Sequence, residues 1–434
     1  MASLNKKRVV THRTHEGAPA RHITGIQELK RTLMSCMLWE NNFYENGVSV
    51  ADRMKSLVSG IEDKAAIAEL AVYARSKGNL RHAPLLITRE LVRNGYNAKT
   101  LLQDVIQRPD EIAEFMAMYW AEGKTPIANS VKKGLALALK KFDAYQLSKW
   151  NKSGKAVTLR DVMFLTHAKP GLGKEDLFKA LAENTLESPD TWEVELSAGK
   201  DKAEVFTRLM AEKKLGALAC LRNLRNMQEA GIDKSIIASY MSGMDTSRVL
   251  PFRFIAAARF APSLEPALES TMFRSLVGRA KLSGSVAVVV DVSGSMSDPL
   301  SEKSDMRRLD AACGLAMLVR ELADDVDIYS FSNDVVSVPT RRGFALRDAI
   351  VKSQHNGGTY LGKALTTITA KRHYDTTIVI TDEQSRDAVP NPKGVGYMIN
   401  VASCKNGVGY GPWIHIDGFS EAILDFIQEH ISQR

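Results

Sequence analysis

Five consecutive apolar residues, 286 to 290, run directly into the sequence Asp291-Val292-Ser293-Gly294-Ser295. Four of the five are valine, and a short valine-rich run is typical of a strand that is buried on both faces of a parallel sheet. The polar residues that follow would lie in a tight loop beyond the carboxyl end of the strand, where open α/β sheets bind their ligands. A carboxylate and two hydroxyls at this point can hold a divalent cation.

The chain from residue 285 onward alternates strand-like and helix-like segments. We predict strands at 286–290, 326–331, 376–381, 397–402 and 413–416, and helices at 309–323, 344–353, 361–372 and 421–431. This alternation indicates a doubly wound α/β domain, spanning residues 285–434, with a mostly parallel sheet.

Two further segments would bring oxygen ligands to the same edge of this sheet. One hydroxyl follows a pair of glycines in a loop before a helix, and one carboxylate follows the predicted strand 376–381. The candidate metal ligands are therefore Asp291, Ser293, Ser295, Thr359 and Asp382. We expect Mg²⁺, because hydroxyls and water at short range suit a small hard cation, with one coordination position open to a partner's carboxylate or phosphate.

Glu383 directly follows Asp382. From the sequence alone, we cannot decide whether this second carboxylate adds negative charge to the site and so changes its affinity for a cation. A loop at the end of the sheet that binds no metal is the alternative interpretation. A metal-dependent nuclease needs clustered carboxylates and a group that activates water, whereas hydroxyls dominate here. No HExxH, GxSxG, Walker A or catalytic cysteine–histidine motif occurs in the sequence. We therefore predict a binding protein and not an enzyme.

The four cysteines are scattered and form no CxxC pair, so we expect reduced thiols and a cytoplasmic protein. The sequence has no signal peptide and no apolar run of the roughly 18 residues that a membrane span requires, so we expect no membrane association.

Residues 23–284 form a predicted helical region, because apolar residues recur at spacings of three and four between short glycine-containing breaks. Many short helices with short connections fit a stacked helical-repeat array. Residues 1–22 are polar and basic, and we interpret them as a flexible arm.

The net charge of +8 is divided unevenly along the chain. Residues 285–434 hold 15 basic and 19 acidic residues, which leaves 43 of the 58 basic and 31 of the 50 acidic residues before them.

This basic excess predicts a polyanionic partner for the helical region, with RNA or DNA as the leading candidates. Lys133 and Lys140 lie seven residues apart on one helix face, opposite the apolar residues. Arg222 and Arg225 lie three residues apart, also off the apolar stripe. For each pair taken alone, a solvated surface without a ligand is the alternative interpretation.

The helical and α/β parts together resemble the Ro (TROVE-domain) RNA-binding protein family, in its compact bacterial or phage form. The segments that carry the resemblance are Leu165-Thr166-His167-Ala168-Lys169-Pro170, Leu221-Arg222-Asn223-Leu224 and Ser247-Arg248-Val249-Leu250-Pro251-Phe252. The C-terminal set resembles the metal-ion-dependent adhesion site of von Willebrand factor type A domains. That pattern implies that the three hydroxyls bind the ion directly or nearly so and that the two aspartates act largely through water.

The resemblance implies a ring of HEAT-like helical repeats (the TROVE module, 23–284) followed by a Rossmann-like von Willebrand A domain. It implies binding of small structured non-coding (Y-like) RNA on the outer surface and of single-stranded ends of misfolded RNA in the hole. It further implies a role in RNA quality control as an adaptor to an exoribonuclease such as polynucleotide phosphorylase. We expect the chain to act as a monomer.

His167 and Lys169 are the RNA contacts that this resemblance suggests. They follow a helix that begins after Thr158, and Pro170 cannot continue that helix. A histidine can hydrogen-bond to or stack on a nucleotide, and a lysine can meet a phosphate. The alternative function is a metal-dependent protein-adhesion scaffold, in which the type A domain captures an acidic partner and RNA binding is incidental.

Overall fold

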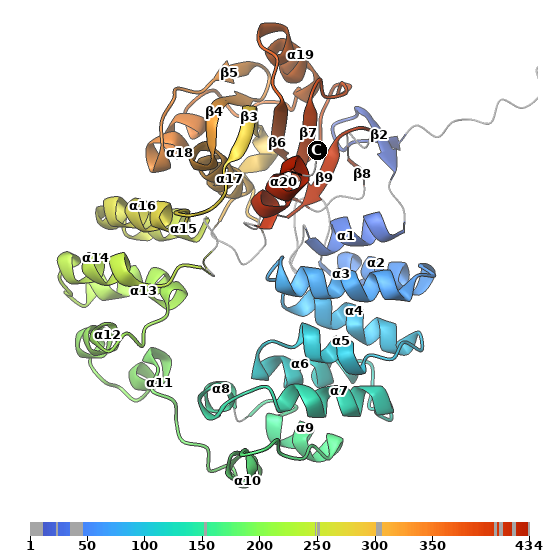
Figure 1. The fold of residues 1–434 in the computed structure, drawn as a ribbon, viewed down its shortest axis with the longest axis vertical. Helices are drawn as coiled ribbons and strands as arrows, with labels where there is room; N and C mark the ends of the chain where they lie inside the picture. Colours follow the sequence, from blue (N-terminus) through green and yellow to red (C-terminus); the bar gives the residue numbers. More distant parts are fainter. Residues whose placement is uncertain are drawn as a thin grey trace, which may run out of the picture. The chain divides into compact units, whose positions relative to one another are not determined.

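The computed structural model describes residues 12–22, 25–34, 47–151, 154–247, 249, 252–300, 306–402, 406–407, 411–418 and 422–432 (Figure 1). The chain divides into two compact units. One unit is Ser49–Asp245, and the other combines Met1–Val48 with Thr246–Arg434. These units differ from the predicted divisions after residues 22 and 284, because the N-terminal segment and the last helices before the sheet both belong to the unit that contains the sheet.

The unit formed by residues 49–245 consists of helices in its described part. They are α2 (Gly47–Gly60), α3 (Lys64–Ser76), α4 (His82–Arg93), α5 (Lys99–Val105), α6 (Pro109–Tyr119), α7 (Asn129–Leu139), α8 (Ala144–Trp150), α9 (Leu159–Thr166), α10 (Glu175–Glu183), α11 (Trp192–Ser197), α12 (Lys202–Ala211), α13 (Ala217–Glu229) and α14 (Lys234–Gly243). This confirms the predicted helical region.

Successive helices of this unit pack against their near neighbours in the chain. Helix α3 packs against α4 and α5, α5 against α7, and α7 against α9. Side chains such as Leu86, Ile112 and Leu135 are completely buried between them. Polar side chains cap several of the helices. At the N-terminal end of α3, the carboxylate of Asp63 accepts a hydrogen bond from the backbone N–H of Ala66 at 2.9 Å. Across the described residues, no helix is long and apolar enough to cross a membrane.

The sheet of the other unit has the strand order β5-β4-β3-β6-β7-β9. Its strands are β3 (Leu282–Asp291), β4 (Ala323–Phe331), β5 (Val335–Ser337), β6 (Thr376–Thr381), β7 (Val395–Asn400) and β9 (Ile414–Asp417). All neighbours are parallel except β5, which pairs antiparallel with β4. The helices of this α/β part are α17 (Arg308–Leu322), α18 (Gly343–Val351), α19 (Leu361–Lys371) and α20 (Ala422–Ser432). The predicted doubly wound fold is confirmed, and β5 is a strand that the sequence did not predict.

The valine-rich run forms the centre of this sheet, since β3 lies between β4 and β6. Residues 286–290 are completely buried. On one face, Ala287 and Val289 form a core with Leu361 and Leu365 of α19. Helix α17 packs against β3 and β4. A strand covered in this way must be apolar throughout, which explains why it lacks the alternating pattern of a half-exposed strand.

Two helices that precede the sheet also belong to this unit. They are α15 (Phe252–Phe260) and α16 (Glu265–Arg274). Helix α15 packs against α17, and the guanidinium of Arg259 lies 2.6 Å from a carboxylate oxygen of Asp310. Tertiary contacts of this kind leave no boundary signal in the sequence.

The N-terminal segment is held in place over its described part. Strands β1 (His12–Arg13) and β2 (Pro19–His22) pair antiparallel, and β2 also pairs with β8 (Asn406–Gly407). Helix α1 (Ile26–Met34) follows and packs against β9. The prediction of a flexible arm over residues 1–22 therefore does not hold for residues 12–22, because backbone pairing fixes them; residues 1–11 lie outside the described residues.

Candidate metal centre and nucleic-acid interface

Asp291 ends β3 and is completely buried. One of its carboxylate oxygens accepts a hydrogen bond from the backbone N–H of Ser293 at 2.8 Å, and the other accepts one from the hydroxyl of Thr381 at 2.6 Å. Two fixed bonds hold the carboxylate in one orientation at the carboxyl edge of the sheet. This is the position that the sequence predicted for it.

The loop after β3 brings the serine hydroxyls together. Oγ of Ser293 lies 3.4 Å from Oγ of Ser295, which sits in the short 3-10 helix η2 (Gly294–Ser297). The backbone N–H of Gly294 donates to the carbonyl of Gly357 at 3.0 Å, so this loop is joined to the loop that carries Thr359. The hydroxyl-bearing segments thus meet although they are about sixty residues apart in the chain.

Asp382 follows β6 and is completely buried. Burial and the nearby charge of Asp382 together raise the pKa of Asp291 to about 7. A cation beside the two carboxylates would offset the burial and the charge that raise the pKa of Asp291 and would favour its ionised form. Thr359 is also buried, and its carbonyl accepts a hydrogen bond from the backbone N–H of Arg386 at 2.7 Å. This bond joins the loop after β6, which carries Asp382, to the loop that carries Thr359.

A cationic side chain that the sequence did not predict also reaches this site. Arg308, the first residue of α17, is 1% exposed. Its Nη1 lies 3.3 Å from Oδ2 of Asp382 and donates a hydrogen bond to the carbonyl of Ser295 at 3.1 Å. The same nitrogen lies 3.8 Å from a carboxylate oxygen of Asp298. The guanidinium therefore supplies one positive charge to a site with two buried aspartates.

The donor set fits a small, hard divalent cation. Three hydroxyls and two carboxylates are oxygen donors of the kind that Mg²⁺ takes up together with water, and the buried carboxylate pair retains an excess negative charge beside Arg308. Metal binding by these five residues stays a prediction. Among the described residues, no group of three or more histidine, cysteine, aspartate or glutamate side chains offers a different kind of metal site.

Glu383, which directly follows Asp382, is paired with residues outside the predicted metal site. It is completely buried at a backbone φ of 60°, and it forms an ion pair with Arg31 of α1. Its other carboxylate oxygen lies 2.8 Å from Nδ1 of His415. Burial alone would raise the pKa of Glu383, but Arg31 and His415 lower it below its ordinary value. The negative charge of Glu383 is thus balanced by α1 and β9 and is not added to the metal ligands.

The predicted RNA contacts lie at the end of α9. The helix begins with a capping box, in which the side chains of Thr158 and Asp161 exchange hydrogen bonds with each other's backbone N–H groups. It ends at His167, whose φ of 50° is left-handed. This turn takes the chain out of the helix before Pro170. Both His167 and Lys169 are exposed to solvent, so each can contact a ligand.

We call the exposed segment from His167 to Lys169, at the end of α9, the RNA-binding corner. The loop that follows this corner contacts the helix that carries one of the predicted lysines. Lys140 caps the C-terminal end of α7, and its carbonyl accepts a hydrogen bond from Nζ of Lys174 at 2.7 Å. Lys174 also donates to the carbonyl of Phe142 at 2.8 Å. The loop after His167 is therefore fastened to the end of α7. Lys133 lies earlier on the same helix and is exposed.

The two predicted arginines both lie on α13, whereas His167 lies at the end of α9. Arg222 and Arg225 are exposed on α13, which packs against α12 and α14. Nε of Arg225 lies 3.5 Å from a carboxylate oxygen of Glu229, so its charge is partly compensated. The role of all six residues in RNA binding stays a prediction.

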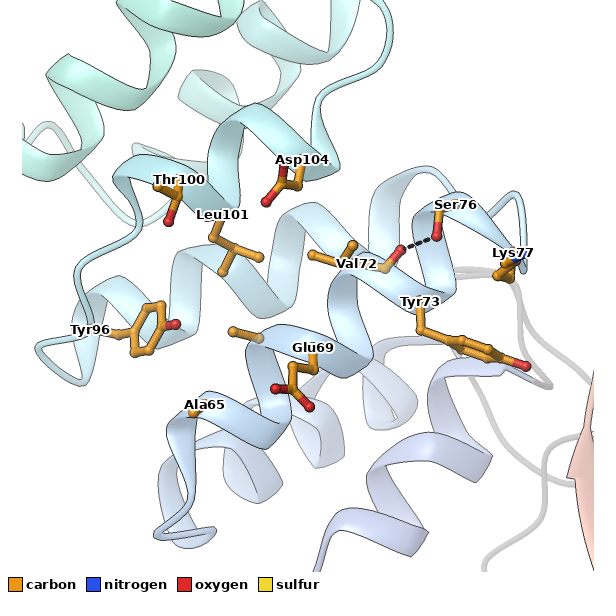
Figure 2. Close-up of a pocket in the computed structure, with 11 residues that line it drawn as sticks. Ala65, Glu69, Val72, Tyr73, Ser76, Lys77, Tyr96, Thr100, Leu101 and Asp104 are labelled. Atoms are coloured by element: carbon orange, nitrogen blue, oxygen red, sulfur yellow. Dashed lines mark hydrogen bonds between the residues drawn. The ribbon is translucent and has the colours of Figure 1, made fainter.

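A pocket of about 450 Å³ lies elsewhere in this unit, along α3 and α5 (Figure 2). Tyr73 and Tyr96 line it together with two acidic side chains, Glu69 and Asp104. Two carboxylates in a hollow of this size repel phosphate. We therefore do not assign RNA binding to this pocket.

Comparisons with known proteins match two successive regions of the chain. A TROVE domain matches residues 169–276, and a Ro60 vWA domain matches residues 285–393. The crystal structure of the Ro (RSR) protein of Deinococcus radiodurans is similar in fold, with a TM-score of 0.62 at 16% sequence identity, covering 94% of this chain and 99% of that one. Telomerase protein component 1 of Rattus norvegicus is 34% identical over 112 residues, and the match covers 23% of this chain and 4% of that much longer protein.

Proposed function

We propose that this chain, a member of the Ro family in which a TROVE domain precedes a Ro60 vWA domain, binds small structured Y-like RNA and the single-stranded ends of misfolded RNA. As a TROVE-family protein it is an RNA-binding protein. The observation that carries the finer proposal is the exposed His167 and Lys169 at the left-handed end of α9. Lys169 is the first residue of the TROVE match, and His167 lies two residues before it.

The chemistry of this corner suits a nucleic-acid strand. The ammonium group of Lys169 can neutralise a phosphate, and the imidazole of His167 can donate to a phosphate or a ribose or stack on a base. Lys140 and the exposed Lys133 on the adjoining α7 extend the positive charge. Contacts of this type release counterions, so binding should weaken steeply as salt is raised.

The α/β part supports an adaptor role without catalysis. With Mg²⁺ bound, the site would offer a Lewis-acidic coordination position to a carboxylate of a partner protein. Ser293, Ser295 and Thr359 would hold the ion by their hydroxyls, and the buried Asp291 and Asp382 would balance its charge. We propose that the protein works in cytoplasmic RNA quality control in this way, as a monomer that links bound RNA to an exoribonuclease such as polynucleotide phosphorylase.

The test is an anisotropy titration of the full-length protein with a fluorescent RNA hairpin that carries a single-stranded tail. We expect the double variant His167→Ser/Lys169→Ala to weaken binding by tenfold or more, since it removes two contacts, one of them to phosphate. The matched control is Lys352→Ala/His355→Ser, which removes an exposed lysine and histidine after α18. Equal losses in both double variants would contradict a specific role for the end of α9.

A second candidate function, a metal-dependent adhesion scaffold, is favoured by the convergence of the three hydroxyl-bearing or carboxylate-bearing loops. The variant Ser293→Ala/Ser295→Ala separates it from the first. If adhesion is the main function, this variant loses Mg²⁺-dependent capture of an acidic partner protein, and the His167→Ser/Lys169→Ala variant has no effect on that capture. RNA affinity of the serine variant should stay at the wild-type value in either case, and equal Mg²⁺-dependent capture by the serine variant and the wild type would contradict the adhesion function.

A further inference from the structure

Phe164 of α9 is an aromatic side chain that lies outside the buried face of its helix. It is 54% exposed, more than any other phenylalanine whose exposure the structure describes. The helix already buries Leu159, Val162 and Met163 on its apolar side. A large exposed ring costs free energy in water, so its place next to a predicted ligand site calls for a functional explanation.

Arg160 is fixed above this ring. Its guanidinium carbon lies 5.2 Å from the ring centroid, and its Nε donates a hydrogen bond of 2.6 Å to the carbonyl of Ala182 near the end of α10 (Glu175–Glu183). An arginine anchored by a second helix does not have to be ordered when a ligand arrives. The pair therefore presents a preorganised arrangement of an aromatic ring and a positive charge.

Phe164 also lies in the last turn of α9, three residues before His167. The backbone N–H of His167 donates to the carbonyl of Phe164 at 3.1 Å, so the residue that carries the exposed ring is joined through its backbone to the left-handed end of the helix. Beyond them, Leu172 is fully exposed in the loop that leads to α10. One short stretch thus combines an exposed ring, an exposed aliphatic side chain and three cationic or hydrogen-bonding groups, at Arg160, His167 and Lys169.

We propose that Phe164 and Arg160 form a stacking platform for an unpaired base of a single-stranded RNA whose phosphates meet His167 and Lys169. Every base has a π face, so aromatic stacking accepts any sequence, and an arginine beside the ring adds attraction to the strand. The surrounding positive charge favours a nucleic acid over an apolar peptide. The platform rests on the proposed RNA-binding function and adds to it a preference for unpaired nucleotides over duplex.

The experiment uses the full-length protein and a single-stranded RNA oligonucleotide that contains 2-aminopurine, whose fluorescence falls when it stacks. Anisotropy of a terminal dye reports affinity, and 2-aminopurine fluorescence at saturation reports stacking. Phe164→Leu keeps an apolar side chain and removes the π face. We expect it to weaken binding by about fivefold or more and to abolish the quenching, whereas Phe164→Trp should preserve both.

Tyr145 provides the matched control. It is 50% exposed on α8, and Nζ of Lys149 lies 5.9 Å from its ring centroid. Tyr145→Leu should leave affinity and quenching at wild-type values. Because Phe164 is exposed, the melting temperature of Phe164→Leu should stay near that of the wild type, which excludes unfolding as the cause of any loss.

The outcomes separate the platform from the proposed function beneath it. If Phe164→Leu binds and quenches like the wild type while His167→Ser/Lys169→Ala weakens binding, the platform is wrong and the RNA-binding corner stands. Equal losses in Phe164→Leu and Tyr145→Leu would also overturn the platform. If the wild-type protein does not bind the oligonucleotide, the result contradicts both the stacking platform and the proposed binding of single-stranded RNA. The exposed ring would then be a candidate contact for a protein partner.

Discussion

Nη1 of Arg308 lies 3.3 Å from Oδ2 of Asp382, one of the two aspartates in the predicted metal site. Both side chains are almost completely buried. Charges this close interact strongly when little water separates them. If the site binds a divalent cation as we propose, its affinity would depend on a positive charge that the chain itself supplies.

Replacing Arg308 by methionine should increase the affinity of the site for Mg²⁺. The substitution removes one positive charge a few ångströms from the expected ion, and at an effective dielectric constant near 20 this is worth about tenfold or more in the dissociation constant. Without metal, the same variant should be less stable, by about 3–5 kcal/mol, because Asp382 loses a buried ionic partner. Calorimetric titration with Mg²⁺ measures the first effect and thermal unfolding the second.

The control is the neighbouring Arg307→Met, since Arg307 is exposed. It should change neither quantity appreciably. Equal Mg²⁺ affinity in the wild type and in Arg308→Met would show that the guanidinium does not compensate the site.

Replacing Arg31 by methionine should destabilise the unit that contains the sheet. Glu383 is completely buried and would lose its ion pair with Arg31 while keeping its contact with His415, so we expect a loss below the roughly 3–5 kcal/mol of a buried charge left with no partner. The double variant Arg31→Met/Glu383→Met should regain part of this stability, because an apolar pair has no desolvation cost, whereas His415 and the buried Asp417 lose their contacts with Glu383 and Arg31. Thermal and urea unfolding of Arg31→Met, Glu383→Met and the double variant measure the coupling. If the two single losses simply add in the double variant, the pair is not coupled.

The sequence predicts the sheet domain closely because its signals are local. The run at 286–290 and the strand 376–381 are apolar throughout, and a change from such a run to polar residues marks the carboxyl edge of a parallel sheet. Asp291 and Asp382 are found at this edge. The end of α9 at His167 is likewise local, because a capping residue and a proline enclose the helix.

The charged partners of these sites could not be predicted in the same way. Arg308 meets Asp382 across 74 residues of chain, and Arg31 meets Glu383 across 352. An arginine beside an apolar helical stripe has the same local pattern whether it is solvated or buried. The N-terminal strands are two and four residues long, too short for an alternating pattern, and are held by backbone hydrogen bonds that any sequence can make.

Thiol reactivity should test the burial of Cys220 and Cys313. Cys220 and Cys313 are completely buried. Burial raises the pKa of the Cys220 thiol to about 12 and raises the pKa of the Cys313 thiol as well, so neither is a thiolate at pH 8. With Ellman's reagent at that pH, we expect no more than two of the four thiols of the native protein to react quickly. All four should react after unfolding, and rapid reaction in Cys36→Ser/Cys404→Ser would contradict the buried positions.

The basic residues of the helical unit should differ in what they contribute to the salt dependence of RNA binding. Each lysine or arginine that neutralises a phosphate adds roughly one to the slope of log affinity against log salt concentration. Lys133 and Arg222 are exposed, so Lys133→Ala and Arg222→Ala should each lower the slope by about one if they contact the RNA. Arg225 already lies 3.5 Å from the carboxylate of Glu229, and Arg225→Ala should change the slope less. Anisotropy titrations over a range of about 50 to 300 mM KCl measure the slopes. Slopes equal to that of the wild type in all three variants would remove these residues from the RNA interface.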